Sequence, residues 1–324
     1  MFGRNYDWPV DVGLALVNQR GLEKTALPPE DGAPMTWISR YGGLTFNQYG
    51  RESPNGGINE KGLVIEVLWL NEARYAKPDA RPALNALGWI QYQLDTATTI
   101  DEVMASDARV RIASDFSPKL HYLVCEQSGR CATVEFIGGK MVSHSANDLP
   151  VAVLANDTYA ASLKHLASLG INAGLDDVDG SRNASLNRFS RAAIMVKDYE
   201  KNPAHAPLDY AFDVLKEVNY TGLTKWSIVY DETSRHVFFR TLANPKIRSI
   251  NLGALDYVCG SGMKMIDMNA AGNGDLTSRM VKYSPRANRA LIEAAFSHTR
   301  LTANLPVDVL DQVVLYSDKA VCKG

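Results

Sequence analysis

The sequence predicts an α+β protein in which sheets are stacked between layers of helices. Three observations lead to this fold class. Short β-rich runs bounded by Gly, Asn or Pro fill the first third of the 324-residue chain, helical stripes and strands alternate after it, and three strand-like runs follow one another over residues 226–252. No internal repeat, low-complexity tract or linker interrupts this pattern, so we expect one domain over residues 1–324.

The first third of the chain is predicted to form strands. The β-rich runs cover residues 13–17, 35–39 and 44–46. The sequence PNGG at residues 54–57 is typical of a turn. The run at residues 62–69 is almost continuously apolar, which indicates a strand that is covered on both faces of its sheet.

Helices and strands are predicted to alternate through the rest of the chain. Residues 83–94 place Leu84, Leu87, Ile90 and Leu94 on one helical face. The sequence TIDE at 99–102 resembles a capping box that opens a second short helix. The other expected strands are 119–124, 132–136, 151–154, 226–230, 237–241 and 247–252, the other expected helices are 188–199, 208–218, 287–296 and 307–315, and the polar stretch 174–187 is expected to be a loop.

The composition excludes several classes of protein. A net charge of −2 provides no electrostatic footprint for nucleic acid or an anionic membrane surface. We find no apolar run long enough to span a membrane and no signal-peptide core at the N-terminus. Phosphate-binding, nucleophile-elbow and zinc-protease motifs are missing, and the six histidines and four cysteines lack metal-ligand spacing. We therefore expect no nucleic-acid or membrane partner, no metal and no cofactor.

Cys125 and Cys131 flank a short polar sequence that suits a β-hairpin. If residues 127–129 form a three-residue loop with Gly129 in the left-handed region, the two cysteines face each other as a non-hydrogen-bonded pair. A disulfide can bridge that spacing. Two reduced strand cysteines are the alternative, so the sequence leaves both a periplasmic and a cytoplasmic location open.

Four segments of the chain together resemble the choloylglycine hydrolase and penicillin V acylase family. They are FGRNYDW from Phe2, GGINEKGLVIEVLW from Gly56, VAVLAND from Val151 and SLNRFSRAA from Ser185. The resemblance implies the N-terminal-nucleophile hydrolase fold, a four-layer αββα sandwich with two stacked, mainly antiparallel sheets. It also implies hydrolysis of a linear carbon–nitrogen amide bond by a cysteine whose own α-amino group takes the thiol proton.

By this resemblance, Arg4 is the cation beside the thiol, and Asp7 accepts a hydrogen bond from the α-amino group. The two residues are three apart, so a regular strand would point them to opposite faces. A bulge or kink near residues 5–6 is needed to bring both to one site. A solvent-exposed ion pair at a strand end is the alternative.

The resemblance assigns three more catalytic residues and one further binding residue. It makes the side-chain amide of Asn156 and the backbone N–H of Trp69 oxyanion-hole donors, and it places Arg188 in the polar site around the nucleophile. Trp8 and Trp69 become aromatic walls that bind an apolar acyl group. The alternatives are an Asx turn at Asn156, an ion-paired helix-surface arginine at Arg188, and two core tryptophans. Arg191, one turn after Arg188, is interpreted as structural.

Family members carry the nucleophilic cysteine one strand and one turn before the Arg-x-x-Asp segment, where this chain has only Met1 to Gly3. We expect that the chain is N-terminally truncated relative to the family and is inactive without the upstream cysteine. The expected substrates are N-acyl amides with an apolar acyl group, such as penicillin V or acyl-homoserine lactones. A conjugated bile salt hydrolase, which Trp69 disfavours, and a catalytically dead ligand-binding homologue are the alternatives. The resemblance also implies a homotetramer.

Overall fold

Two β-sheets form the centre of the molecule in the computed structural model, which describes residues 1–114, 117–203 and 205–323. Apart from the short β15–β17 pairing, neighbouring strands in both sheets run antiparallel. In order across the first sheet, the strands are β1 (Phe2–Asp7), β13 (Thr224–Asp231), β14 (His236–Thr241), β15 (Arg248–Asn251) and β17 (Gly274–Asp275). Across the second they are β12 (Lys140–Ser145), β11 (Cys131–Ile137), β10 (Leu120–Cys125), β7 (Val64–Trp69), β6 (Pro54–Asn59), β5 (Gly43–Asn47), β2 (Leu14–Asn18), β16 (Lys264–Asp267) and β18 (Val281–Lys282).

The two sheets pack face to face through aromatic and aliphatic side chains. The ring of Phe46 on β5 meets the rings of Tyr230 on β13 and Phe239 on β14 at centroid distances of 6.0 and 6.1 Å. Every one of these side chains is fully buried. Alternation of apolar residues on both facing strands therefore produces one continuous core between the sheets.

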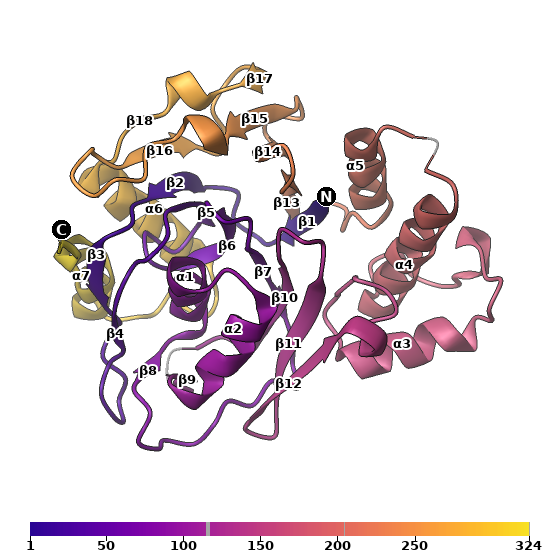
Figure 1. The fold of residues 1–324 in the computed structure, drawn as a ribbon, viewed down its shortest axis with the longest axis horizontal. Coiled ribbons are helices and arrows are strands. Elements are labelled where there is room, and N and C mark those ends of the chain that lie inside the picture. Colours follow the sequence, from indigo (N-terminus) through magenta and orange to yellow (C-terminus); the bar gives the residue numbers. More distant parts are fainter. Residues whose placement is uncertain (115–116, 204, 324) are drawn as a thin grey trace.

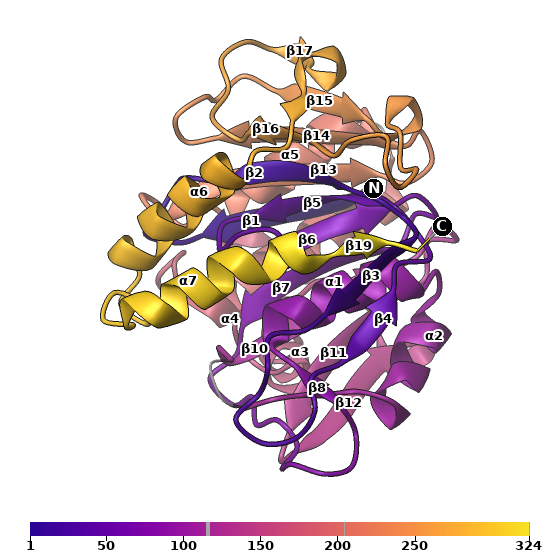
Figure 2. The same cartoon turned by 90° about the vertical axis from the view of Figure 1, so that its left-hand side faces the viewer.

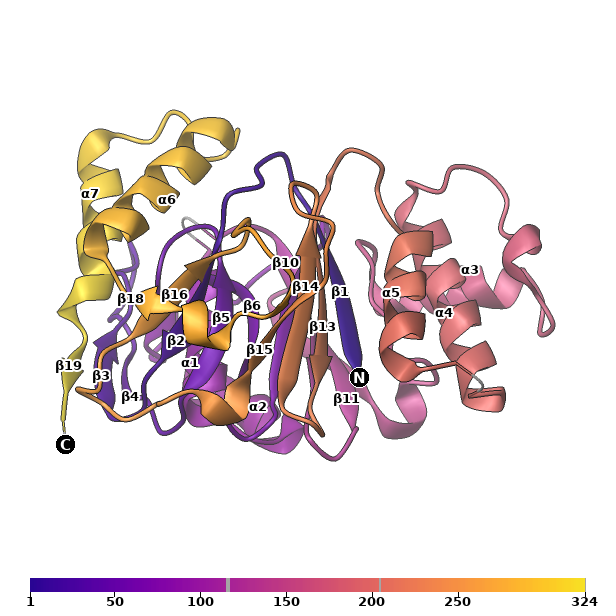
Figure 3. The same ribbon diagram turned by 90° about the horizontal axis from the view of Figure 1, so that it is seen from above.

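Helices cover the outer faces of both sheets (Figures 1 and 3). Phe212 and Leu215 of α5 pack against Val229 of the first sheet. Trp89 of α1 stacks near Tyr122 of the second sheet, with the ring centroids 4.4 Å apart. Figure 3 shows α6 and α7 at one side of the sheets and α3, α4 and α5 at the other. The helices are α1 (Ala86–Thr96), α2 (Ile100–Ala105), α3 (Tyr159–Ser168), α4 (Ser185–Lys201), α5 (Pro207–Glu217), α6 (Pro285–His298) and α7 (Val307–Tyr316).

Two small sheets complete the fold. The C-terminal strand β19 (Val321–Cys322) lies beside β3 (Leu22–Thr25), which pairs in turn with β4 (Thr36–Ile38) (Figure 2). A short parallel pair joins β8 (Ala83–Leu84) to β9 (Arg111–Ile112). The C-terminus of the chain is thus attached to a strand from its first tenth.

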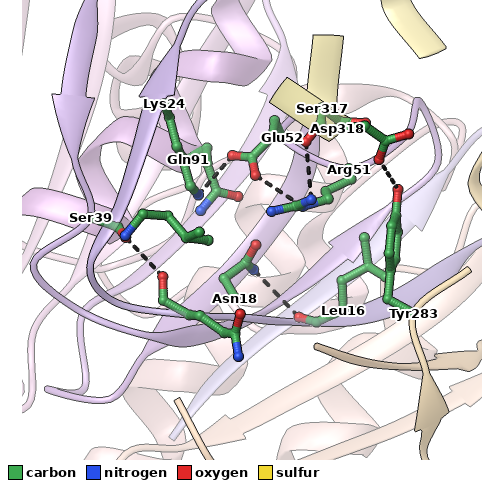
Figure 4. A network of polar contacts seen from close by, with 12 residues as sticks. Leu16, Asn18, Lys24, Ser39, Arg51, Glu52, Gln91, Tyr283, Ser317 and Asp318 are labelled. Atoms are coloured by element: carbon green, nitrogen blue, oxygen red, sulfur yellow. Dashed lines mark hydrogen bonds and ion pairs between the residues drawn. The ribbon is translucent and has the colours of Figure 1, made fainter. Parts of the chain in front are cut away.

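Four buried charged residues connect this C-terminal region to the sheets, and we call them the closed ion network: Lys24, Arg51, Glu52 and Asp95. Lys24 Nζ lies 2.7 Å from a carboxylate oxygen of Glu52 and 2.9 Å from one of Asp95. Arg51 pairs with Glu52 at 3.1 Å and donates to the carbonyl oxygen of Ser317 at 3.0 Å (Figure 4). All four side chains are less than a tenth exposed.

The structure confirms the predicted fold class of stacked, mainly antiparallel sheets between helices. The short helix α2 begins as predicted, because the Thr99 hydroxyl accepts a hydrogen bond from the backbone N–H of Glu102 at 3.2 Å. The Glu102 carboxylate binds Thr98 instead of returning to Thr99, so only half of the capping box forms. The three consecutive strands β13, β14 and β15 are also confirmed.

The turn predicted at residues 54–57 is wrong, because these residues form the first part of strand β6. The two glycines there serve close packing. A Cβ atom on Gly56 would lie 2.0 Å from the Glu66 carboxylate, and one on Gly57 would lie 2.5 Å from the carbonyl oxygen of Leu44. Glycine in a strand can mark a close approach of other atoms as well as a turn.

The strand predicted at residues 151–154 is also wrong, since this segment pairs with no described strand. Its peptide groups bind a nearby side chain and each other instead. The Tyr159 hydroxyl donates to the carbonyl oxygen of Val151 at 2.8 Å, and the backbone N–H of Val153 reaches back to the carbonyl of Val151. Apolar composition alone does not separate a buried extended segment from a strand.

Two disulfides are present. Cys125 and Cys131 are opposite each other on β10 and β11, Gly129 has a φ of 86°, and the two sulfur atoms are bonded. This is the hairpin arrangement that the sequence allowed. The second disulfide, Cys259–Cys322, was not predicted, because its cysteines lie 63 residues apart. Among the helices described, none is both long and apolar enough to cross a membrane.

Candidate active site

Arg4 lies on the face of β1 that packs against the second sheet. Phe2, Arg4 and Tyr6 alternate as buried residues along this strand. Arg4 Nη1 lies 2.6 Å from a carboxylate oxygen of Glu66, and Nη2 donates to the carbonyl oxygen of Val67 at 3.0 Å. The guanidinium carbon is 4.7 Å from the ring centroid of Tyr6. The arginine is therefore held by one carboxylate, and we call Arg4 and Glu66 the cavity ion pair.

Asp7 follows an irregularity in β1. The register against β13 shifts between Tyr6 and Asp7, so that Asp7 lies opposite Thr224. The sequence requires such a bulge near this point. The Thr224 hydroxyl donates to the Asp7 carboxylate at 2.5 Å. Burial raises the pKa of Asp7, although this hydrogen bond and the charges of Arg188 and Arg4 act in the opposite direction.

Trp8 and Trp69 lie side by side at the ends of β1 and β7. Their ring centroids are 6.3 Å apart. The indole N–H of Trp8 donates to the Tyr49 hydroxyl at 2.6 Å, and that of Trp69 donates to the Asn71 side chain at 2.7 Å. Both rings line a cavity, so neither is simply a core tryptophan.

Asn156 is held at the end of an extended segment that leaves its side chain free. Its backbone N–H donates to the hydroxyl of Ser185 at 2.7 Å. The preceding carbonyl, of Ala155, lies 2.7 Å from Nε2 of the buried His121. Within the described residues, the side-chain amide of Asn156 has no hydrogen-bond partner, and the residue lines the cavity. An uncharged donor is thus presented to the cavity from a fixed backbone.

Arg188 lies in the first turn of α4 and is only 9% exposed. Its Nη1 donates to the carbonyl oxygen of Asn183 at 2.9 Å, and its guanidinium carbon is 5.3 Å from the ring centroid of Tyr220. Among the described residues, Arg188 does not form the helix-surface ion pair that was the alternative for it. Arg191 binds Glu217 at 2.8 Å, which agrees with a structural role.

One cavity of about 1220 Å³ unites these residues. Its polar part is lined by Arg4, Asp7, Glu66, Asn156 and Arg188, beside the indoles of Trp8 and Trp69. Aliphatic side chains of α4 and α5 and of the α6–α7 region form apolar walls, among them Ala192, Val196, Val214, Leu215, Leu301, Leu305, Val309 and Val313. All six site residues predicted from the sequence therefore meet at one cavity, although their catalytic roles stay predictions.

The charges inside the cavity are balanced. Arg4 and Arg188 are opposed by Asp7 and Glu66, whereas the other charged side chains that line it among the described residues, Lys119 and Glu200, are exposed. Burial raises the pKa of Glu66 to about 7, against the effects of Arg4 and of a hydrogen bond from Tyr230. The cavity thus holds two carboxyl groups whose pKa values are raised by burial.

Glu66 is the residue of this site that the sequence interpretation missed. A single carboxylate inside the apolar strand VIEVLW was the available signal, because a buried carboxylate requires a partner. Its partner Arg4 is 62 residues away in sequence. All four cysteines form disulfides, so no internal thiol is free to act as a nucleophile. No metal-ligating group of three His, Cys, Asp or Glu residues occurs in the described part of the chain.

Known proteins resemble this chain in sequence and in fold. Residues 1–263 match the family described as linear amide C–N hydrolases, choloylglycine hydrolase family. A penicillin V acylase of Pectobacterium atrosepticum is 27% identical over 277 residues, which cover 70% of each protein. The structure of a penicillin V acylase from Agrobacterium tumefaciens superposes with a TM-score of 0.75 at 28% identity, covering 87% of this chain and 93% of that one. A conjugated bile acid hydrolase from Clostridium perfringens shares the fold, with a TM-score of 0.68 at 18% identity, covering 85% of this chain and 94% of that one.

Proposed function

The chain belongs to the choloylglycine hydrolase family of linear amide C–N hydrolases, and we propose that within this family it is an acylase for N-acyl amides with an apolar acyl group. Penicillin V and acyl-homoserine lactones are substrates of this kind. Two of the similar proteins are named penicillin V acylases, which supports the same choice.

The observation that carries the proposal is the composition of this cavity of about 1220 Å³. Its polar groups come from four separate segments of the chain, which are β1, β7, the segment that ends at Asn156, and α4. They adjoin the paired indoles of Trp8 and Trp69 and the aliphatic walls. An aromatic and aliphatic pocket binds an apolar acyl chain or a phenoxy ring by removing it from water. The adjacent polar groups are then close to the amide that follows the acyl group.

The proposed nucleophile is an N-terminal cysteine on a segment that precedes Met1. Among the strands that the structure describes, β1 has a partner, β13, on one side only. Residues 1–8 line the cavity, so a further strand along the open edge of β1 would enter the cavity. In this proposal Asp7 orients the α-amino group of that cysteine. Arg4 and Arg188 supply positive charge near its sulfur.

The proposed reaction conserves every proton. The α-amine takes the thiol proton, and the sulfur attacks the amide carbon to form a C–S bond. The oxyanion is bound by the Asn156 amide and the Trp69 backbone N–H. The C–N bond then breaks, and the amine leaves with the proton from the α-ammonium group. Water attacks the thioester, its proton returns through the α-amine to the sulfur, and the free acid is released.

The test compares two forms of the protein, the 324-residue chain and a form extended by the sequence encoded upstream. Both are incubated with penicillin V, an acyl-homoserine lactone and glycocholate, and the released amine is measured. We expect the extended form to hydrolyse one of the first two substrates and the 324-residue chain to hydrolyse none. In the extended form, Asn156→Ala should lower kcat by about 10²- to 10³-fold, while Asn202→Ala, on an exposed helix end, serves as the control.

Other outcomes would contradict the proposal in distinct ways. Preference for glycocholate would indicate a conjugated bile salt hydrolase. Binding of an amide without turnover by the extended form would indicate a ligand-binding homologue. Turnover by the 324-residue chain would show that the nucleophile does not lie upstream.

A further inference from the structure

In the cavity ion pair, Glu66 neutralises the charge of Arg4 at a position where a bound ligand would contact it. Glu66 is fully buried and Arg4 is 7% exposed, yet both line the cavity. One carboxylate oxygen of Glu66 binds Arg4 at 2.6 Å, and the other accepts a hydrogen bond from the Tyr230 hydroxyl. Arg4 Nη1 also donates to the carbonyl oxygen of Asn55 at 3.2 Å and Nη2 donates to that of Val67 at 3.0 Å, whereas Nε has no hydrogen-bond partner among the described residues. Both partners are therefore fixed in place.

The neighbouring strand is adapted to hold this carboxylate. Gly56 on β6 lies opposite Glu66 in the register of the sheet. Any side chain at Gly56 would begin 2.0 Å from the Glu66 carboxylate. On the other side, β10 places the apolar Leu123 opposite Glu66. The ionisable groups that face Glu66 are thus Arg4 and Tyr6 from β1 and Tyr230 from β13.

This arrangement determines which ligand charge the cavity favours. An isolated arginine in a low-dielectric cavity would attract a ligand carboxylate strongly. Here the Glu66 carboxylate neutralises that attraction at Arg4, whereas Asp7 acts on the second arginine, Arg188, through space and without a direct ion pair. An anionic group placed beside Arg4 would therefore give up its hydration without gaining contact with an unpaired cation.

We propose that Glu66 is a specificity-determining residue, which neutralises Arg4 so that the cavity favours uncharged N-acyl amides over those that carry a carboxylate. This inference rests on the proposed function, because it concerns the ligands of the same cavity. Among the substrates proposed above, it favours an uncharged amide such as an acyl-homoserine lactone over penicillin V, whose carboxylate belongs to the amine that is released.

The raised pKa of Glu66 supports this assignment. Burial brings the pKa to about 7, so Glu66 takes up a proton as the solution becomes mildly acidic. Arg4 then loses its counter-charge, and the cavity should bind anions more tightly. Burial raises the pKa values of Tyr6 and Tyr230, so both phenols keep their protons throughout this range.

A binding experiment tests the proposal without turnover. Trp8 and Trp69 line the cavity, so their fluorescence reports ligands of the 324-residue chain. The ligands are phenoxyacetamide and phenoxyacetate, which differ in charge and share the phenoxyacetyl group. At about pH 8, we expect Glu66→Gln to tighten binding of phenoxyacetate by about tenfold and to change that of phenoxyacetamide by less than about twofold.

The control is Glu52→Gln, which removes a different buried carboxylate, from the closed ion network. It should leave the preference between the two ligands unchanged. Equal changes for both ligands in Glu66→Gln, or a change of preference in the control, would overturn the proposal. So would the failure of both ligands to bind to the wild-type chain.

A second measurement varies the pH and serves even if Glu66→Gln does not fold. Lowering the pH from about 8.5 to about 5.5 should tighten phenoxyacetate binding several-fold, since Glu66 is protonated over this interval. Asp7→Asn should keep this response, which separates it from any titration of Asp7. An affinity that does not change with pH in the wild type contradicts the proposal.

In an active form of the enzyme, penicillin V and its methyl ester extend the test to turnover. The wild type should prefer the ester, and Glu66→Gln should reduce that preference by about tenfold. An inactive enzyme would contradict the proposed function and would leave the binding result to decide the role of Glu66.

Discussion

Two groups of buried charged residues, the closed ion network and the cavity ion pair, both join basic to acidic side chains but have different roles. The closed ion network places Lys24 between Glu52 and Asp95 and binds Arg51 to the backbone near the C-terminus (Figure 4). The cavity ion pair places Arg4 against Glu66 at 2.6 Å. Every partner in the closed ion network is protein, whereas both members of the cavity ion pair line a space large enough for a ligand.

The difference shows how surroundings decide what a buried ion pair does. Within the closed ion network the charges join β3, the β5–β6 connection, α1 and the residues after α7, so their loss should separate parts of the fold. In the cavity, burial raises the pKa of Glu66 to about 7, so protonation near neutral pH can neutralise this carboxylate. The first group therefore contributes mainly to stability, and the second mainly to the charge that a ligand meets.

The largest expected effect comes from breaking the closed ion network. Lys24→Met leaves Glu52 and Asp95 buried without their shared cation, which should destabilise the protein by roughly 3–5 kcal/mol. Guanidinium unfolding, followed by tryptophan fluorescence, measures this change. Binding of phenoxyacetamide to the folded variant should stay close to that of the wild type. A loss below about 1 kcal/mol would mean that the two groups are not distinct in this way.

A smaller effect is expected from the titration of Glu66. Because its pKa is raised from 4.5 to about 7 in the folded protein, the folded state holds more protons than the unfolded state between these values. Its contribution to stability is therefore complete below the unfolded pKa and is lost as the pH rises through about 7. Between about pH 5 and pH 8 the free energy of unfolding should fall by about 2 kcal/mol more in the wild type than in Glu66→Gln. Parallel pH profiles for the two proteins would contradict this.

The smallest expected effect on stability comes from Arg4→Met. At about pH 8 the cost should be roughly 1–2 kcal/mol, and it should shrink at about pH 5, because Glu66 can be neutralised by a proton after its partner is removed. Lys24→Met, measured in the same way, is the matched comparison. Equal losses for both variants would contradict the distinction between the two charge groups.

Much of the site could be predicted because its residues stand in short ordered motifs. Arg4 and Asp7 lie three residues apart, and Asn156 and Arg188 each end or open a distinctive segment. The requirement for a bulge in β1 followed from the alternation of side chains along a strand, and the register does shift at Asp7. Strand and helix periodicity also predicted β13, β14, β15, α4, α5, α6 and α7, since each buries one face or both.

Other features could not be predicted from local patterns. In the sequence, Gly56 and Gly57 are typical of a turn. In the structure they make room for the Glu66 carboxylate and the Leu44 backbone. Residues 151–154 have the composition of a strand, but the carbonyl oxygen of Val151 accepts a hydrogen bond from the Tyr159 hydroxyl instead of from a neighbouring strand. In both cases the deciding contact comes from a residue on another element of the fold, so the local composition does not reveal it.

The sequence by itself determined the order of strands and helices, the family and the residue types that converge on the cavity. These properties follow from local periodicity, turn chemistry and short motifs, each of which is complete within a few residues. Only the tertiary structure decided that Glu66 compensates Arg4, that Ser185 and His121 hold the Asn156 segment, and that Cys259 binds Cys322. These pairings join residues from 29 to 63 positions apart, and their energies depend on burial, which exists only once the sheets have packed.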